Sequence, residues 1–220
     1  MPLHLNLAAL TGDELERLLG VEAAQKLRPD LSRARMEGKA YRGPEVAPEL
    51  RFELVEEREW GSTVEHTRKL RAYRDALREL EYHEHGTLYA PGLQGARHHV
   101  AFTGHTDTAV AVRWSETPEG VTEGPFLQFV TVLRDRASGV AAVLTTTSVT
   151  PLAPAPSEEV AVRHVPGGSP AEAHTAHRSE VTRHARGVKV ATVTDWQRSW
   201  QALRALNVNA WSRRGLLLEA

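Results

Sequence analysis

Hydrophobic residues recur with a helical spacing in four stretches of the chain. Over residues 63–84, Leu70, Leu77 and Leu80 fall on one face of a helix of 3.6 residues per turn. The other three stretches with this spacing lie at about 12–27, 170–186 and 195–214. In the first of these, Gly20 is expected to bend or split the helix, because glycine is a poor helix former.

Polar residues indicate where these helices begin. A Ser or Thr followed three residues later by Glu or Gln lets the two side chains accept hydrogen bonds from free N–H groups at the helix start. This pairing precedes each of the four predicted helices: Thr11 with Glu14, Ser62 with Glu65, Ser169 with Glu172, and Thr194 with Gln197.

In the centre of the chain, apolar and polar residues alternate instead, which is typical of strands with one buried face. Residues 96–148 predict two antiparallel hairpins with turns at about 104–107 and 135–138. The stretch 126–133 is apolar at nearly every position, so it predicts a central strand covered on both faces. Further strands are expected at 50–54, 160–165 and 188–193.

The predicted fold class is therefore α+β, with a mainly antiparallel sheet of five or six strands packed by three to four helices. We expect a single domain over residues 1–220, because no part of the chain predicts a self-sufficient core. Residues 1–49 are interpreted as a helical N-terminal appendage whose second half, 28–49, is irregular. Residues 149–159 contain three prolines and predict a stiff connector.

Composition narrows the classes of function. The chain has no cysteine, which excludes disulfides, thiol nucleophiles and cysteine-ligated metals. Its formal net charge of −1 shows no basic excess, so nucleic acid is not an expected partner. No apolar run is long enough for a transmembrane helix, and no secretory signal is recognisable. We expect a soluble cytoplasmic protein, and the preference for arginine over lysine indicates a bacterium with GC-rich DNA.

Motifs that carry chemistry are missing. The sequence contains no phosphate-binding loop, no dinucleotide-binding glycine pattern and no nucleophile elbow around a serine. The predicted strands of the two hairpins carry no pair of carboxylates suited to acid and base catalysis. These absences favour a binding protein over an enzyme.

Two groups of histidines are candidate metal ligands. His174 and His177 are three residues apart on the predicted helix 170–186, so both imidazoles could reach one ion. His105 and Asp107 lie together in the first hairpin turn and offer an imidazole with a carboxylate. The alternative is that these helix histidines bond to backbone or water and that Asp107 makes a local turn bond.

Other histidines have simpler interpretations. His98 and His99 are neighbours on a strand and must point to opposite faces of the sheet, so they cannot act together. His83 and His85 are expected at the C-terminal end of the helix 63–84, where a cation would favour the helix dipole.

The last predicted helix is rich in tryptophan and arginine. Trp196, Trp200 and Trp211 lie near one stripe, with Arg204 among several cationic residues. The stripe could be core against the sheet, an interface with a subunit or partner, or a surface lying on an anionic membrane. The interface interpretation makes these four residues the candidate interaction residues.

The sequence thus favours a non-enzymatic binding or protein-interaction domain that needs no cofactor and either self-associates as a homodimer or binds a protein partner. One alternative is a histidine-based metal-binding protein or metal-dependent enzyme, with a divalent ion such as zinc. Another is a domain that holds a small apolar ligand between sheet and helices.

Overall fold

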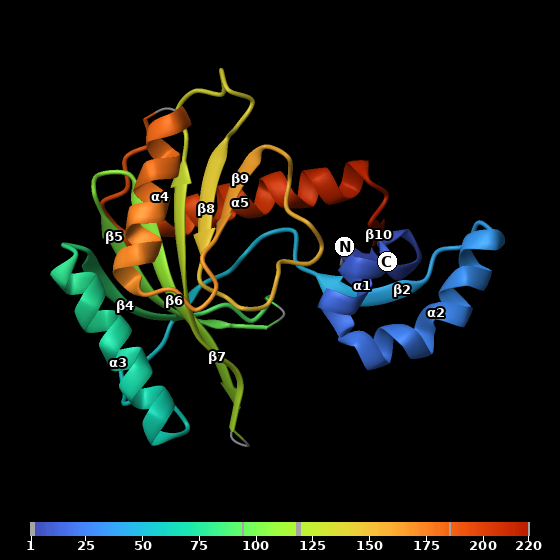
Figure 1. The fold of residues 1–220 in the computed structure, drawn as a ribbon, viewed down its shortest axis with the longest axis horizontal. Helices are drawn as coiled ribbons and strands as arrows, with labels where there is room; N and C mark the ends of the chain where they lie inside the picture. The colour runs from blue at the N-terminus through green and yellow to red at the C-terminus, as the bar shows by residue number, and fades with distance from the viewer. Residues whose placement is uncertain (1–2, 94, 118–119, 185, 220) are drawn as a thin grey trace. The chain divides into compact units, whose positions relative to one another are not determined.

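The structure is a computed structural model of the chain, and it describes residues 3–93, 95–117, 120–184 and 186–219. The chain folds into two compact units, both drawn in Figure 1. Unit 1 comprises Met1–Glu49, Thr150–Glu158 and Arg204–Ala220, and unit 2 comprises Leu50–Val149 and Glu159–Leu203. The predicted N-terminal appendage and most of the proline-rich connector therefore belong to one unit, together with the C-terminal segment.

Unit 2 is built on a seven-stranded sheet with the strand order β3-β4-β5-β6-β7-β8-β9. All neighbouring pairs are antiparallel except β8 and β9, which are parallel. The α+β class and the mainly antiparallel sheet are confirmed, with more strands than the predicted five or six. The strands are β3 (Glu53–Leu54), β4 (His83–Tyr89), β5 (His98–Gly104), β6 (Thr108–Thr117), β7 (Gly120–Val132), β8 (Ala142–Thr146) and β9 (Val160–His164).

Both predicted hairpins are present, as β5–β6 and β7–β8. The first turn is tight because His105 and Thr106 both adopt positive φ, at 49° and 66°. The central position of β7, between β6 and β8, explains why its sequence is apolar on both faces. Leu127 and Phe129 are buried on one face, and Val130 is buried on the other.

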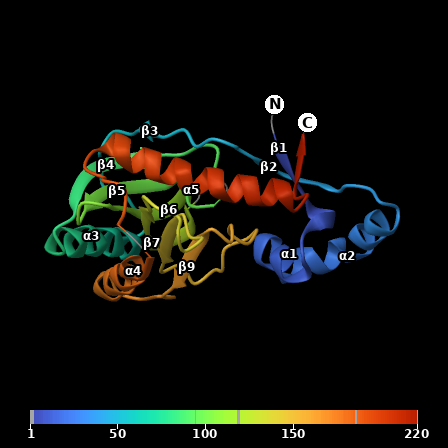
Figure 2. The same cartoon turned by 90° about the horizontal axis from the view of Figure 1, so that it is seen from above.

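Three helices cover this sheet: α3 (Val64–Glu79), α4 (Pro170–His184) and α5 (Val193–Arg213). Figure 2 shows α3 and α4 on one side of the sheet and the first part of α5 on the other. Ser169 and Glu172 form the predicted cap of α4. The caps of the other two helices are each displaced from the prediction: α3 is capped by Thr63, and α5 by Thr192 paired with Asp195.

Unit 1 has its own small sheet, with the strand order β10-β1-β2. Its core contains Leu5, Leu31, Trp211 and Leu216. Glu14 is buried, and its carboxylate accepts hydrogen bonds from Arg214 at 2.8 Å. The elements are β1 (Leu3–Asn6), a 3-10 helix at Leu7–Ala9, α1 (Gly12–Leu19), α2 (Val21–Met36), β2 (Arg42–Val46) and β10 (Leu217–Glu219).

In the N-terminal region one prediction is confirmed and two are corrected. The helix expected at 12–27 is split at Gly20, whose φ is 82°, as the sequence suggested. The second half, however, continues through Pro29 to Met36 and replaces part of the expected irregular connection. Proline removes one helical hydrogen bond, and the burial of residues such as Leu31 in α2 offsets that loss. The rest of 28–49 contains β2, which the sequence pattern did not reveal.

Two corrections concern unit 2. The helix expected at 63–84 ends at Glu79, and the positive φ of Glu81, 63°, turns the chain into β4. His83 and His85 therefore lie in a strand, not at a helix end. The strand expected at 188–193 is absent from the described residues there, where the nearest strand-like pairing is an isolated bridge between Leu133 and Gly187.

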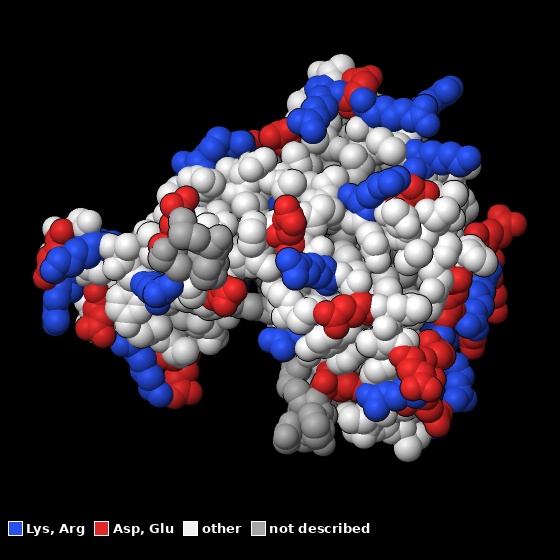
Figure 3. All heavy atoms as spheres, turned by 180° about the vertical axis from the view of Figure 1, so that it is seen from behind, with Lys and Arg blue, Asp and Glu red and all other residues white. Residues whose placement is uncertain are grey.

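None of the helices that the structure describes has both the length and the apolar composition needed to cross a membrane. On the face drawn in Figure 3, acidic and basic side chains are intermixed over the surface. That face therefore carries no extended patch of a single charge.

Candidate functional site

Helix α4 is fixed to the sheet through a buried histidine. His177 is 0% exposed, and its two ring nitrogens lie 3.0 Å from the hydroxyl oxygens of Thr131 and Thr145. Burial, followed by the nearby charge of Arg178, lowers the pKa of His177 to about 3. The imidazole is therefore neutral, and both of its nitrogens are engaged by the strands beneath it.

Asp107 forms a second anchor for α4. Its carboxylate accepts hydrogen bonds from Arg178 at 2.6 Å, from Thr108 at 3.2 Å and from the backbone N–H of Gly187 at 3.2 Å. Side chains from the first hairpin and from α4 thus meet in an ion pair that is largely shielded from water. The contact is more than the local turn bond that the sequence suggested.

His105 and His174 are brought together beside these anchors. Their ring centroids are 4.6 Å apart, although one residue lies in the β5–β6 turn and the other in α4. Nδ1 of His174 lies 2.9 Å from the hydroxyl of Tyr82, and Nε2 of His105 donates to the carbonyl of Leu80 at 3.0 Å. Each half-buried ring is thereby held by one of its two nitrogens.

The two predicted metal pairs are thus rearranged by the fold. The ring nitrogens of His177 are taken up by threonine hydroxyls, and the carboxylate of Asp107 is taken up by Arg178. Within the described residues there is no group of three or more His, Cys, Asp or Glu that could hold a metal ion. The fold instead brings together one member of each predicted pair, His105 and His174, with ring centroids 4.6 Å apart.

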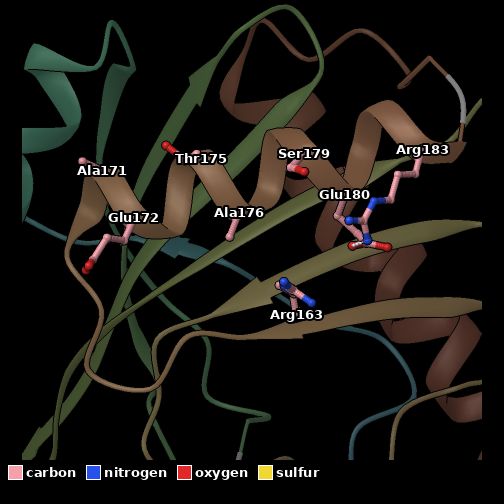
Figure 4. Close-up of a pocket in the computed structure, with 8 residues that line it drawn as sticks. All are labelled: Arg163, Ala171, Glu172, Thr175, Ala176, Ser179, Glu180 and Arg183. Carbon is pink, nitrogen blue, oxygen red and sulfur yellow. Dashed lines mark hydrogen bonds and ion pairs between the residues drawn. The ribbon is translucent and has the colours of Figure 1, made fainter.

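A hollow of about 480 Å³ lies between α4 and β9. Small side chains on the outer turns of α4, including Ala176 and Ser179, leave this space open because they do not reach the strand. In Figure 4, Arg163 projects from β9 below the helix, while Ala176 and Glu180 point from the helix toward the strands. The eight lining residues are Arg163, Ala171, Glu172, Thr175, Ala176, Ser179, Glu180 and Arg183.

Three of the four charged residues in this groove already have partners. Glu172 caps the start of α4 through Ser169, and Arg183 donates to Glu180 at 3.1 Å. Arg163 is exposed and makes no hydrogen bond or ion pair with any residue that the structure describes. The charge available to a ligand in the groove is therefore positive.

The groove runs beside an open edge of the sheet. β9 pairs only with β8 in the described sheet. The N–H of Val165 donates to Thr146 at 2.9 Å, so the alternate N–H groups of Ala161 and Arg163 also point toward β8. The N–H groups of Val160, Val162 and His164 therefore point away from β8, toward the open edge. The side chains of these three residues lie on the face of the sheet away from α4.

A second hollow, of about 520 Å³, lies beside α3 and is lined by four arginines. Arg71 pairs with Glu59, and Arg58 pairs with Glu116. Arg74 donates to Glu57 and Glu84, and Arg78 pairs with Asp75 and Glu84. Because each guanidinium has a carboxylate of the chain itself, this hollow offers no unpaired charge comparable with Arg163.

The tryptophans of α5 lie in the interior of the described chain. Trp196 is 0% exposed and donates to the carbonyl of Val110 at 2.7 Å, and Trp200 is also buried. Trp211 donates to the carbonyl of Ala155, and the Arg204 guanidinium lies 5.2 Å from its ring while donating to Ala47. These side chains pack as core, so none of the three rings offers the exposed area that a protein interface needs.

Sequence reasoning found several residues near α4 but missed the groove. It singled out His174, His177, His105 and Asp107, all of which lie at or under this helix. It did not single out Arg163, because one arginine in a short strand is ordinary. The signal available was the row of small residues on the helix 170–186, beside the face that carries His177.

No family model, no curated protein and no solved structure matches this chain.

Proposed function

We propose that unit 2 is a non-enzymatic interaction module that binds an extended acidic peptide of a partner protein along β9. The observation that carries the proposal is an unpaired strand edge lying directly beside a groove. An added strand would gain main-chain hydrogen bonds from the edge, and the groove would receive its alternate side chains. This is a specific form of the interaction class that the sequence favours.

The direction of side chains in β9 supports this mode of binding. Arg163 lies on the α4 side of the sheet, since it lines the groove. Because side chains of paired strands share faces, every second side chain of an added strand would face α4 and enter the groove. The small residues of α4 leave room for them there.

The charge of the groove indicates an acidic peptide. Arg163 has no partner in the described chain, whereas the two carboxylates of the groove are already bonded to Ser169 and Arg183. A glutamate or aspartate of the peptide next to Arg163 would complete a charge-assisted hydrogen bond. A lysine at the same place would face like charge.

Binding is expected to fail when the edge is blocked. Val162→Pro removes one outward N–H of β9 without removing a bond to β8, and proline is tolerated at such edge positions. We expect the variant to bind an eight-residue peptide of alternating valine and threonine with one central glutamate at least about tenfold more weakly, since strand addition depends on these bonds. Fluorescence polarisation of the labelled peptide measures the affinity.

A matched control is available at the opposite edge. Leu54→Pro places proline at an exposed, outward-facing position of β3 and should leave peptide binding unchanged. Arg163→Gln should abolish the preference for the glutamate peptide over the same peptide with lysine in place of glutamate.

His164→Pro removes another outward N–H of β9 and replaces Val162→Pro in the test if that variant fails to fold. Equal affinities of the wild type and a folded edge variant would overturn the proposal, as would a dimer in light scattering that only the edge variants abolish.

A further inference from the structure

The pair formed by His105 and His174 is not used by the proposed peptide groove. The two imidazoles come from separate elements and lie beside each other, with ring centroids 4.6 Å apart and ring planes tilted by 42°. Both residues are only partly buried. Holding α4 on the sheet does not require the contact between His105 and His174, because His177 and Asp107 already anchor the helix.

Each ring has one nitrogen held by the protein and one left over. The carbonyl of Leu80 fixes Nε2 of His105 as a donor, so in the neutral ring Nδ1 carries a lone pair. Tyr82 holds Nδ1 of His174, which leaves Nε2. Neither remaining nitrogen has a partner in the described chain. Histidines that ligate metals have the same arrangement, with the other nitrogen bonded to a carbonyl, carboxylate or hydroxyl oxygen.

The spacing of the rings fits a shared ion. A zinc–nitrogen bond of roughly 2.1 Å added to a ring radius of roughly 1.1 Å puts the ion about 3.2 Å from each ring centre. Two rings bound at angles of roughly 90–110° then have centres about 4.5–5.2 Å apart. The observed separation lies at the short end of this range.

The turn that carries His105 is fixed in an uncommon conformation. His105 and Thr106 both have positive φ, a region that costs free energy for residues other than glycine. The backbone N–H of Val190 donates to the carbonyl of Thr106 at 2.9 Å and holds the turn closed. The position of the imidazole therefore results from tertiary contacts and not from a relaxed loop.

We propose that His105 and His174 form a two-imidazole site for a divalent transition-metal ion such as zinc, with water completing the coordination. Imidazole nitrogen suits zinc, copper and nickel. For Nε2 of His174 to bind the ion, its Nδ1–H would donate to the hydroxyl of Tyr82, which can accept as well as donate. Arg178, one helical turn from His174, is paired with Asp107 at 2.6 Å.

The test uses zinc chloride and the full chain without a histidine tag. Calorimetry should show one zinc ion per chain at neutral pH, and His105→Asn and His174→Gln should each weaken binding at least about tenfold. Asparagine is suited to the left-handed backbone at position 105, so that variant should keep its fold. Nitrogen-15 spectra of the imidazoles should shift at Nδ1 of His105 and Nε2 of His174.

The chain contains a matched control pair. His83 and His85 on β4 have ring centroids 4.8 Å apart, and among the described residues Thr103 holds His85 at 2.8 Å while none holds His83. His83→Asn should leave zinc affinity unchanged. The proposal would be overturned by the absence of zinc binding at micromolar concentrations, or by imidazole shifts and a loss of affinity that follow His83 in place of His105 and His174.

Discussion

Replacing Asp107 with alanine is expected to lower the free energy of unfolding of the protein by about 3–5 kcal/mol. The side chain of Asp107 is 11% exposed and is the ion-pair partner of Arg178. Its removal leaves a partly buried guanidinium without a counter-charge and the backbone N–H of Gly187 without its acceptor. Both losses carry a desolvation cost, which the remaining hydrogen bond from Arg178 to the Thr108 hydroxyl at 3.1 Å offsets only in part.

Urea unfolding followed by far-ultraviolet circular dichroism measures this loss. Asp135→Ala is the matched control, because its carboxylate is exposed and accepts a single local turn bond from Ala137. That variant should lose less than about 1 kcal/mol. If Asp107→Ala were as mild as the control, the ion pair would not anchor α4, and the sequence interpretation of Asp107 as a free ligand would regain support.

Lowering the pH from 7 to 5 is expected to destabilise the folded protein, with His177 alone contributing about 2 kcal/mol. Burial holds the pKa of His177 at about 3, whereas an unfolded histidine titrates near 6.5. Below pH 6.5 the unfolded state therefore binds a proton that the folded state refuses, and stability falls until the pH reaches the folded pKa. His99 acts in the same direction, because complete burial, with Arg113 nearby, also lowers its pKa.

The measurement is the free energy of unfolding at half-unit steps between pH 7 and pH 5. The slope of the unfolding free energy against pH reports how many protons the chain takes up on unfolding. His177→Gln lacks the titrating group, so this number should decrease by about one, whatever the variant's stability at pH 7. Thr175→Ala replaces an exposed side chain that carries no titratable group, so this variant should keep the wild-type slope. A slope unaffected by His177→Gln would show that this imidazole is protonated in the folded protein.

Much of the local structure could be predicted from the sequence. The hairpin β5–β6 and the helix α4 lie close to their expected positions, because alternation and helical spacing are short-range signals. The cap formed by Ser169 and Glu172 was readable for the same reason. The failures occurred where the tertiary structure outweighs propensity, as at Glu81, where a left-handed residue ends α3 early and begins β4.

The candidate sites were only partly predictable. The sequence identified His105 and His174 separately and assigned each a partner close to it in the chain. A pairing between a hairpin turn and a helix depends on how α4 packs across the sheet, and no spacing along the chain encodes that contact. The same reason hid the groove of Arg163, since an edge strand becomes visible only once the strand order is known.

The order of residues alone indicated the two hairpins, the approximate positions of most helices, and the absence of cysteine chemistry. Packing between elements determined which histidines meet, that β9 lies at an edge of the sheet, and that the tryptophans of α5 are interior. The division has a physical cause. Periodicity reports the burial of each residue, whereas a binding surface depends on contacts between elements that are distant in the chain.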